Sequence, residues 1–421
     1  MTSIEKIEKS IKILESREIK EKLFSPIKNL KIDYESLLNE EQQRALFSLE
    51  GKYLVIAGAG SGKTRILTYR SAYLIESGIK PQNILMITFT KKATLEMKSR
   101  IKTLIGKKAN MLTVSTFHSF AYQILARYNS GNRLIDIMEN DEIEYDLLIE
   151  ELIRILMIDE IFRSKLQSRY KYIMVDEYQD CNDKQTQLLK LLVGSGGNIM
   201  AVGDDFQSIY AFRGSNIENI FCFIDTFSDA KLIKLRTNYR SYDEIIRYIN
   251  KVSRSFRVKY RKNVVGTGKK GGRIFKNRFK SEERQWEYIA DKIVRMKDEG
   301  IEYSEMAILF RNRYAVVKIE KYLKDTKVPY YKKEDEAAKG VALVSVHSAK
   351  GLEWEVVFLP TMLEGIFPTI DRENQRKNLE EEKRLFYVAC SRAKRYLFLL
   401  YPDYYYEKTG YHNIPSRFLD Y

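Results

Sequence analysis

The chain has 421 residues, of which 44% are hydrophobic and 31% charged, and its 72 Lys and Arg against 57 Asp and Glu give a net charge of +15. This length allows two domains with separate cores, and the sequence has no apolar run long enough to cross a bilayer, which excludes a membrane-spanning protein. The positive charge favours a polyanionic partner, usually a nucleic acid, over a surface that is basic only for solubility.

The N-terminal stretch MTSIEKIEKSIK is too charged to be a secretory signal. Its apolar residues Ile4, Ile7, Ile11 and Leu14 are spaced for one face of a helix, with Lys and Glu between them. We expect residues 1–36 to form an amphipathic helical extension that packs on the body of the protein. Docking of this helix on a partner is the alternative.

The three cysteines, Cys181, Cys222 and Cys390, lie far apart in the sequence and in no metal-binding spacing. We therefore expect small core residues in a reduced compartment. Together with the lack of an apolar span, this favours a cytoplasmic protein with no membrane partner.

Residues 37–232 alternate apolar runs with segments of helical periodicity. The runs LVIAG, ILMITFT, MLTVSTF, YIMVD and NIMAVGD are typical of buried strands, and TRILTYRSAYLIES and KKATLEMKSRIKTLIG are typical of helices. This alternation predicts a parallel sheet flanked by helices. Residues 128–170 are acidic and predicted to be helical, with a short helical insertion expected near 128–146.

A second alternating block begins near LIKLRTNYRS and is taken as residues 233–421. Helices are predicted over 282–297 and 314–324, and strands at AILFR, ALVSV, VVFLP and YLFLL. No long Pro-, Gly- or Ser-rich linker separates the blocks, and the basic stretch RKNVVGTGKKGGR at 261–273 is predicted to be an exposed loop. The predicted fold class is therefore α/β with two tandem lobes.

The segment YLVIAGAGSGKT joins a predicted strand to a predicted helix through a loop of small residues. Small side chains let backbone N–H groups close around phosphate oxygens, and the helix N-terminus adds its positive dipole end. Lys63 would supply charge to the β- and γ-phosphates, and the Thr64 hydroxyl would bind Mg²⁺. Ala57 stands at the first position of this loop, where glycine is more usual.

The segment YIMVDEYQD places two carboxylates at the end of a buried strand downstream of that loop. Asp176 can hold Mg²⁺ through water, and Glu177 can orient and deprotonate an attacking water. A surface charge pair is the alternative, but it does not account for the position after an apolar strand. We therefore expect nucleoside triphosphate hydrolysis.

A further strand ends in GDDFQSIYAFRG. The neutral amide of Gln207 can sense whether a γ-phosphate is present. Tyr210, Phe212 and Arg213 combine ring faces with a cation, the elements that single-stranded nucleic acid needs. One short segment could thus couple nucleotide state to base stacking.

With these motifs the chain resembles the UvrD/Rep-type helicases of superfamily one, in the family's order from Asn39 to Asp420. The other matching motifs are LNEEQQRAL, ITFTKKATLEMKSRI, TVSTFHSF, LRTNYRS, VSVHSAKGLEWEVVFL and EEEKRLFYVACSRAKRYLFLL. The resemblance implies two RecA-like lobes with an ATP site in the cleft between them, and ATP and Mg²⁺ as cofactors.

Residue roles also follow from the resemblance. ATP contacts are implied for Gln42, Ala59, Gly60, Gly62, Lys63, Thr64, Arg65, Tyr239 and Glu353, with Thr64 and Asp176 on the metal. Catalytic roles are implied for Lys63, Glu177, Gln207, Arg240 and Arg392, the two arginines reaching the γ-phosphate from the second lobe. DNA contacts are implied for Phe89, Thr90, Thr116, His118, Tyr210, Phe212, Arg213 and His347.

The resemblance implies an ATP-dependent single-stranded DNA translocase or helicase that moves 3′ to 5′ and uses a 3′-tailed duplex. The family's second helical insertion is expected to be missing near residues 332–341, so strand separation without a partner stays open. A protein partner would then supply the duplex contact or a nuclease activity. Phe212 stands where the family more often has tryptophan.

Two other functions remain open. The chain could be an ATP-gated nucleic-acid-binding subunit of a repair or antiviral defence complex, without unwinding of its own. A phosphoryl-transfer enzyme acting on a small metabolite is less favoured, because it leaves the motifs after Glu177 without a role.

Overall fold

The computed structural model describes residues 3–21, 30–128, 145–312, 314–332, 339–369, 375–403 and 414–421. The chain divides into two compact units: unit 1 comprises Met1–Arg236 and Tyr260–Lys262, and unit 2 comprises Thr237–Lys259 and Asn263–Tyr421. The boundary predicted at 232/233 lies four residues before the end of the first segment of unit 1. Most of the expected insertion near 128–146, and the expected deletion near 332–341, lie outside the described residues.

Unit 1 is built on a six-stranded sheet in the order β3-β2-β4-β5-β1-β6, and every pairing in it is parallel. Its strands are β1 (Lys52–Ala57), β2 (Ile84–Thr88), β3 (Thr113–Thr116), β4 (Tyr172–Val175), β5 (Asn198–Gly203) and β6 (Lys231–Leu235). The strands are nearly continuous apolar runs because helices cover both faces of a parallel sheet. β6 is LIKL with its preceding lysine, so the run expected to open the second block belongs to the first sheet.

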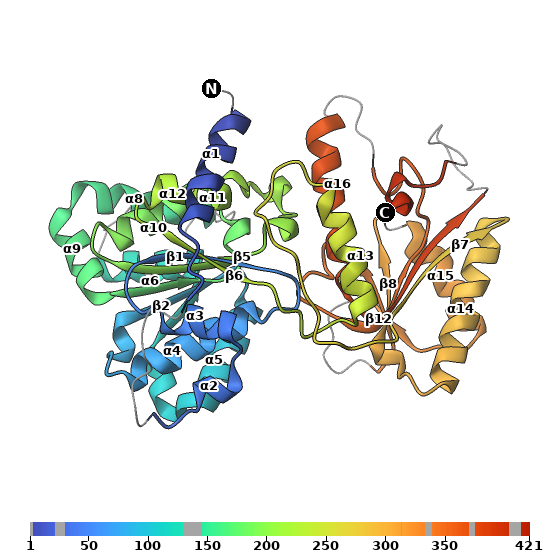
Figure 1. Cartoon of the computed structure of the whole chain (residues 1–421), viewed down its shortest axis with the longest axis horizontal. Coiled ribbons are helices and arrows are strands. Elements are labelled where there is room, and N and C mark those ends of the chain that lie inside the picture. Colours follow the sequence, from blue (N-terminus) through green and yellow to red (C-terminus); the bar gives the residue numbers. More distant parts are fainter. Residues whose placement is uncertain are drawn as a thin grey trace. The chain divides into compact units, whose positions relative to one another are not determined.

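Helices lie on both faces of this sheet, with α8 and α10 opposite α4 and α5 (Figure 1). They are α2 (Tyr34–Leu37), α3 (Glu40–Phe47), α4 (Lys63–Glu76), α5 (Lys91–Ile105), α6 (Phe117–Tyr128), α8 (Tyr145–Ile158), α9 (Glu160–Arg169), α10 (Asp183–Val193), α11 (Glu218–Phe221) and α12 (Phe223–Thr226). One core joins Ile66 and Leu67 of α4 to Val55 and Ala57 of β1. This packing holds the start of α4 at the carboxyl end of the sheet.

The N-terminal helix α1 (Ser3–Ser16) lies beside α11 and α12 (Figure 1). Its buried residues Ile7, Ile11 and Leu14 face unit 1, and the Ser10 hydroxyl donates to Asp225 at 3.1 Å. After the helix, Ile19 N–H donates to the Leu232 carbonyl at 2.8 Å, which extends the sheet at the β6 edge. The helix therefore packs on its own chain.

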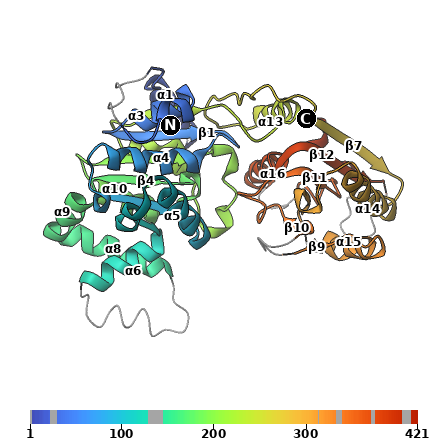
Figure 2. The same ribbon diagram turned by 90° about the horizontal axis from the view of Figure 1, so that it is seen from below.

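Unit 2 has a second six-stranded parallel sheet, in the order β7-β12-β11-β8-β10-β9. Its strands are β7 (Arg273–Phe279), β8 (Met306–Phe310), β9 (Tyr330–Tyr331), β10 (Val341–Ser345), β11 (Trp354–Leu359) and β12 (Ala393–Pro402). Its helices are α13 (Asp243–Arg254), α14 (Glu282–Asp298), α15 (Tyr314–Asp325) and α16 (Gln375–Cys390), with α14 and α15 on one face (Figure 2). The fold class predicted from the sequence, α/β with two tandem lobes, is confirmed.

The expectation of an exposed loop over 261–273 is wrong in part. Lys262 and Val264 are buried, whereas most of the glycine-rich remainder is exposed. A lysine in a basic, glycine-bearing stretch normally indicates solvent, and only partners distant in the sequence explain its burial. Within the described residues, the structure contains no helix that is both long and apolar enough to cross a bilayer.

Candidate nucleotide site and nucleic-acid interface

The loop between β1 and α4 has the backbone of a phosphate cradle. Gly60 and Gly62 have φ of 69° and 85°, the left-handed region that glycine adopts without strain. A Cβ on Gly62 would lie 3.1 Å from Nε2 of Gln42, so a larger residue would also crowd the Gln42 side chain. Ala59 and Ser61 are buried, and Ser61 Oγ donates to the Gly58 carbonyl at 2.7 Å. The loop is therefore closed by its own contacts above the N-terminus of α4.

The predicted catalytic and metal-binding side chains of β1–α4 and β4 meet at the end of the sheet. Thr64 Oγ1 donates to Asp176 Oδ2 at 3.0 Å, and Lys63 Nζ lies 3.8 Å from Glu177 Oε1. Burial, together with the neighbouring Glu177 carboxylate, raises the pKa of Asp176. A cation at this point would offset that cost, because it would favour the ionised carboxylate.

The donors at this point suit Mg²⁺. Thr64 supplies a hydroxyl and Asp176 a carboxylate, which are the hard oxygen ligands that Mg²⁺ takes beside phosphate oxygens and water. The part of the chain that the structure describes holds no cluster of three or more His, Cys, Asp or Glu that could bind a metal by itself. A Mg²⁺ ion held by Thr64 and Asp176 would take its other ligands from phosphate oxygens and water.

Gln179 links the two acidic segments of unit 1. Its Nε2 donates to Glu177, and its Oε1 accepts from the Asp204 N–H at 2.8 Å. The Asp204 carboxylate in turn accepts from Nε2 of Gln207 at 2.7 Å. The predicted water-orienting residue and the predicted γ-phosphate sensor are therefore connected through the side chain of Gln179 and through the backbone N–H and carboxylate of Asp204.

On the other side of the loop, Gln42 and Arg65 flank the position expected for a base. Gln42 closes a capping box with Asn39 at the start of α3 and donates to the Ser61 carbonyl at 3.0 Å. Arg65 donates to the Leu37 carbonyl at 3.0 Å and lies over the Tyr69 ring, 5.2 Å from its centroid. These contacts hold both side chains beside the loop without a ligand.

An exposed aromatic pair follows Gln207 in the same segment. Phe212 is 63% exposed, and its ring centroid lies 6.0 Å from that of Tyr210. The Arg213 guanidinium lies over both rings, 5.2 Å from the Tyr210 centroid and 5.5 Å from the Phe212 centroid. A large apolar ring with a cation beside it, exposed to solvent, is a platform on which a base can stack.

The other predicted contacts of unit 1 with DNA lie at the ends of β2 and β3. Phe89 packs edge-on against Phe117, and Thr90 caps α5 by accepting from the Ala93 N–H at 3.0 Å. Thr116 accepts from the Ser119 N–H at 3.2 Å, and His118 is half-buried on the first turn of α6. Thr90 is thus exposed, but its hydroxyl already caps α5, and Thr116 is buried.

In unit 2, Arg240 lies in a network of its own. Its guanidinium pairs with Glu353 and donates to the Ser391 carbonyl at 3.1 Å, and Lys394 also lies 3.3 Å from Glu353. Burial alone would raise the pKa of Glu353, but Arg240 and Lys394 hold it below its ordinary value. Tyr239, which precedes Arg240 in the chain, is 40% exposed. The structure brings together Arg240 and Glu353, two residues predicted from separate motifs.

Arg392 is 1% exposed, and its guanidinium is used inside unit 2. It donates to the carbonyls of Val388 and Leu352, both at 3.0 Å, and to the Ser391 hydroxyl at 2.9 Å. A phosphate role for Arg392 would require some of these contacts to be exchanged. His347 is half-buried, in the turn after β10.

Two family models match the chain in the order of its two units. The UvrD/REP helicase N-terminal domain matches residues 38–135 and 133–228, and the UvrD-like helicase C-terminal domain matches residues 233–337 and 331–404. The chain belongs to the UvrD-like helicase family.

Similar proteins are named DNA helicases. The ATP-dependent DNA helicases PcrA of Staphylococcus epidermidis and Staphylococcus aureus are 31% and 30% identical over 366 residues, which is 70% of this chain and 50% of theirs. A protein named probable DNA helicase from Mycoplasma pneumoniae is 31% identical over 467 residues, covering 91% of this chain and 86% of that protein. The chain thus spans about half the length of the PcrA relatives that it matches.

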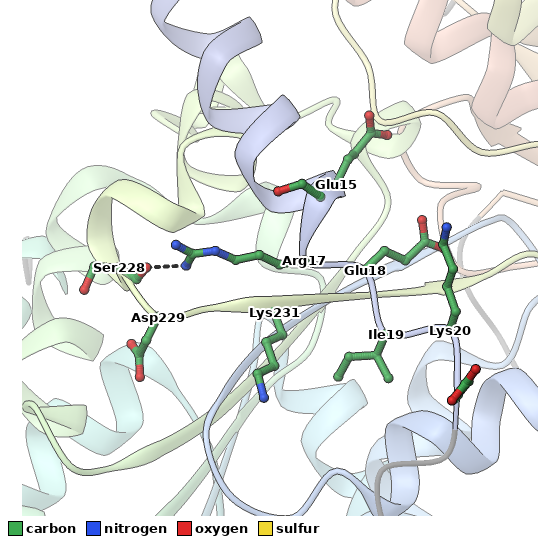
Figure 3. Close-up of a pocket in the computed structure, with 10 residues that line it drawn as sticks. Glu15, Arg17, Glu18, Ile19, Lys20, Ser228, Asp229 and Lys231 are labelled. Atoms are coloured by element: carbon green, nitrogen blue, oxygen red, sulfur yellow. Dashed lines mark hydrogen bonds between the residues drawn. The ribbon is translucent and has the colours of Figure 1, made fainter.

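This UvrD-like chain also has a depression of about 930 Å³ beside the end of α1, lined by Glu15–Glu21, Ser228, Asp229 and Lys231. In Figure 3 the Arg17 side chain extends toward Ser228, whereas the Glu15 carboxylate points away from both. None of the predicted nucleotide or DNA residues lines it, so we assign it no part in the site.

The residues missed by sequence reasoning are those that connect the motifs. Gln179 lies within the quoted VDEYQD, and its position two residues after Glu177 was the available signal. Lys262 had no such signal, because its partners lie more than fifty residues away in the sequence.

Proposed function

We propose that this protein is an ATP-dependent translocase or helicase of single-stranded DNA that moves 3′ to 5′ in the cytoplasm, with ATP and Mg²⁺ as cofactors. Membership of the UvrD-like family and the similarity to proteins named DNA helicases support this class. One observation carries the proposal: a single segment leads from Gln207, linked to the Glu177 network, to the exposed ring of Phe212. The direction of movement rests on the family resemblance alone.

In this proposal the residues of unit 1 bind and hydrolyse ATP. The backbone of the loop at 58–62 and the N-terminus of α4 bind the phosphates, and Lys63 adds a positive charge. Thr64 and Asp176 would hold Mg²⁺, which offsets phosphate charge when it is bound. Glu177, 3.8 Å from Lys63, orients the attacking water and accepts its proton.

The residues of unit 2 would complete the reaction. Arg240 and Arg392 stabilise charge that develops on the transferred phosphoryl group, while Tyr239 and Glu353 contact the adenine and ribose. In that role Arg240 must share its guanidinium between Glu353 and a phosphate. We propose that this exchange is one event that accompanies nucleotide binding.

DNA binding is proposed for side chains at the ends of the unit 1 strands and in unit 2. Tyr210, Phe212 and Arg213 supply the stacking platform, and the remaining contacts are proposed for Phe89, Thr90, Thr116, His118 and His347. The exposure of Phe212 favours it as the principal anchor.

A second candidate is an ATP-gated nucleic-acid-binding subunit of a repair or antiviral defence complex, without unwinding of its own. This candidate is supported by the alignment with the PcrA relatives, which covers 50% of their length. The other half of those proteins has no match in this chain. A partner would then supply the duplex contact or the nuclease.

Two measurements test the function and separate the candidates. The ATPase rate of the purified chain is compared with single-stranded DNA, RNA and duplex at one salt concentration, since phosphate contacts make binding salt-dependent. Streptavidin displacement is then compared on oligonucleotides with biotin at the 5′ or the 3′ end, with Lys63→Ala as the inactive control. A 3′-to-5′ translocase strips streptavidin from the 5′ end only.

The outcomes are distinct. ATPase stimulated by single-stranded DNA without displacement would favour the gated subunit, and displacement from the 3′ end would reverse the proposed direction. An ATPase rate that no nucleic acid changes would overturn both candidates.

A further inference from the structure

The segment Tyr260–Lys262 belongs to unit 1, although the residues on both sides of it belong to unit 2. The chain leaves unit 1 after Arg236, returns for this segment, and leaves again after Lys262. Such a return needs specific contacts, because ordering a loop residue costs conformational entropy. The contacts are therefore informative about what the segment does.

Each residue of the segment has a partner in a different part of unit 1. The Tyr260 N–H donates to Asp205 Oδ2 at 3.0 Å and its hydroxyl donates to the Ile220 carbonyl at 2.9 Å. The Arg261 N–H donates to Glu15 at 2.8 Å, and Glu15 also accepts from Lys234 at 3.1 Å. The end of α1 thus helps to hold the segment in place.

Lys262 makes the deepest of these contacts. Its side chain is 1% exposed, and its Nζ lies 2.5 Å from one carboxylate oxygen of Asp204 and 2.5 Å from one of Asp205, both of which are fully buried. The same amine lies 4.1 Å from the centroid of the Phe206 ring. Burial alone would lower the pKa of Lys262, but the two carboxylates raise it above its ordinary value.

Asp204 connects Lys262 to the residues of the proposed site. One of its carboxylate oxygens accepts from Lys262, and the other accepts from Gln207 at 2.7 Å. Its N–H donates to Gln179, which donates to Glu177. A buried carboxylate keeps its ionised form and its orientation through the cations and hydrogen-bond donors around it, and besides Lys262 and Gln207 the Phe206 N–H donates to Asp204 at 3.1 Å. Removing Lys262 would take away the cation that contacts Asp204, which favours protonation or rotation of this carboxylate and so weakens the fixed acceptor of Gln207.

We propose that Lys262 is a positioning residue that sets the orientation of Gln207 and Glu177 through Asp204. This inference rests on the proposed ATPase function of the same site. Because Lys262 lies in the chain that joins the two units, the same contact fastens that connection to the segment that senses the γ-phosphate. Lys262 is not among the residues proposed to bind the nucleotide.

The test uses the full chain with Lys262→Met, which keeps the side-chain length and removes the charge, and Lys262→Met/Asp205→Asn, which also removes the surplus buried negative charge. Lys259→Met is the matched control, because it removes a nearby lysine whose amine donates to the carbonyls of Ser253 and Arg254. Measurements are the ATPase rate with single-stranded DNA, the affinities for a non-hydrolysable ATP analogue and for DNA, and amide hydrogen exchange.

For a positioning role, kcat with DNA falls at least about tenfold in the double variant, while both affinities stay within about twofold of the parent. Amide exchange also rises at residues 177–179, which Lys262 does not contact. A double variant that is folded, has lower thermal stability and keeps the parental kcat would overturn the proposal, because Lys262 would then be a structural ion pair only.

Failure of the proposed function has a different signature. If the parent and Lys259→Met both lack ATPase activity stimulated by DNA, the proposed function fails. Amide hydrogen exchange at residues 177–179 then tests whether Lys262 positions Glu177. Unchanged exchange at 177–179 in the Lys262 variants would then overturn this positioning role.

Discussion

Unit 1 and unit 2 both rest on six-stranded parallel sheets, but their predicted site residues stand in different surroundings. In unit 1 the predicted residues contact one another: Thr64 donates to Asp176, and Lys63 lies 3.8 Å from Glu177. In unit 2 Arg240 pairs with Glu353, whereas Arg392 is buried among carbonyls of its own unit.

The difference follows from how each group is positioned. Strands that lie next to one another in a parallel sheet end at the same edge, so residues placed directly after β1, β4 and β5 converge by topology. A long arginine side chain is positioned by whichever acceptors it finds. The residues predicted for hydrolysis in unit 1 are therefore placed by the fold, whereas a phosphate contact by Arg240 or Arg392 would require each arginine to exchange side-chain partners.

The largest expected effect tests the group in unit 1. Lys63→Ala should lower kcat for ATP by about 10³-fold, because a charge aimed at the phosphates is lost, while binding of single-stranded DNA survives. Steady-state ATPase rates and fluorescence anisotropy of labelled DNA measure the two properties. Lys80→Ala, at an exposed lysine of the same unit, is the control. Turnover within tenfold of the parent would contradict the site.

Arg240→Ala tests the first arginine of unit 2. It should lower kcat by about 10²-fold with little loss of stability, since Glu353 keeps Lys394 as a partner at 3.3 Å. The matched control is Arg247→Ala, whose side chain is 72% exposed. Equal rates for the two variants would remove Arg240 from the reaction.

Arg392→Ala sharpens the comparison, because it separates a structural role from a catalytic one. It should lower the free energy of unfolding by about 2–3 kcal/mol, since it leaves buried carbonyls without donors. Chemical denaturation measures this loss of stability, and the ATPase rate of the folded variant measures the catalytic role of Arg392. An unchanged kcat would assign Arg392 to structure alone.

Phe212→Ala is expected to have the smallest effect. It should weaken binding of single-stranded DNA by about 1–3 kcal/mol, because one stacking face is lost, and leave the ATPase rate without DNA unchanged. Titrations at a single salt concentration measure the affinity. Val317→Ala, at an apolar side chain in unit 2 that is 69% exposed, is the control. Unchanged affinity would take Phe212 out of the DNA path.

Much of the fold and of the site in unit 1 could be predicted from local sequence. Helix α14 was predicted over 282–297 and lies at Glu282–Asp298, and β10 matches ALVSV closely. Such elements follow from the periodicity of their own residues. By contrast, β7 was not predicted, because this edge strand mixes basic, polar and apolar residues and has no continuous apolar run.

The sequence by itself determined the α/β class and the family to which the chain belongs, and it predicted the phosphate loop, because each depends on residues that are close together or in a set order. Only the tertiary structure decided that β6 joins the first sheet, that Arg392 is buried, and that Lys262 pairs with Asp204 and Asp205. The physical reason is that these features depend on partners far apart in the chain. A charged side chain can be buried only where such partners pair with it, and local sequence does not show them.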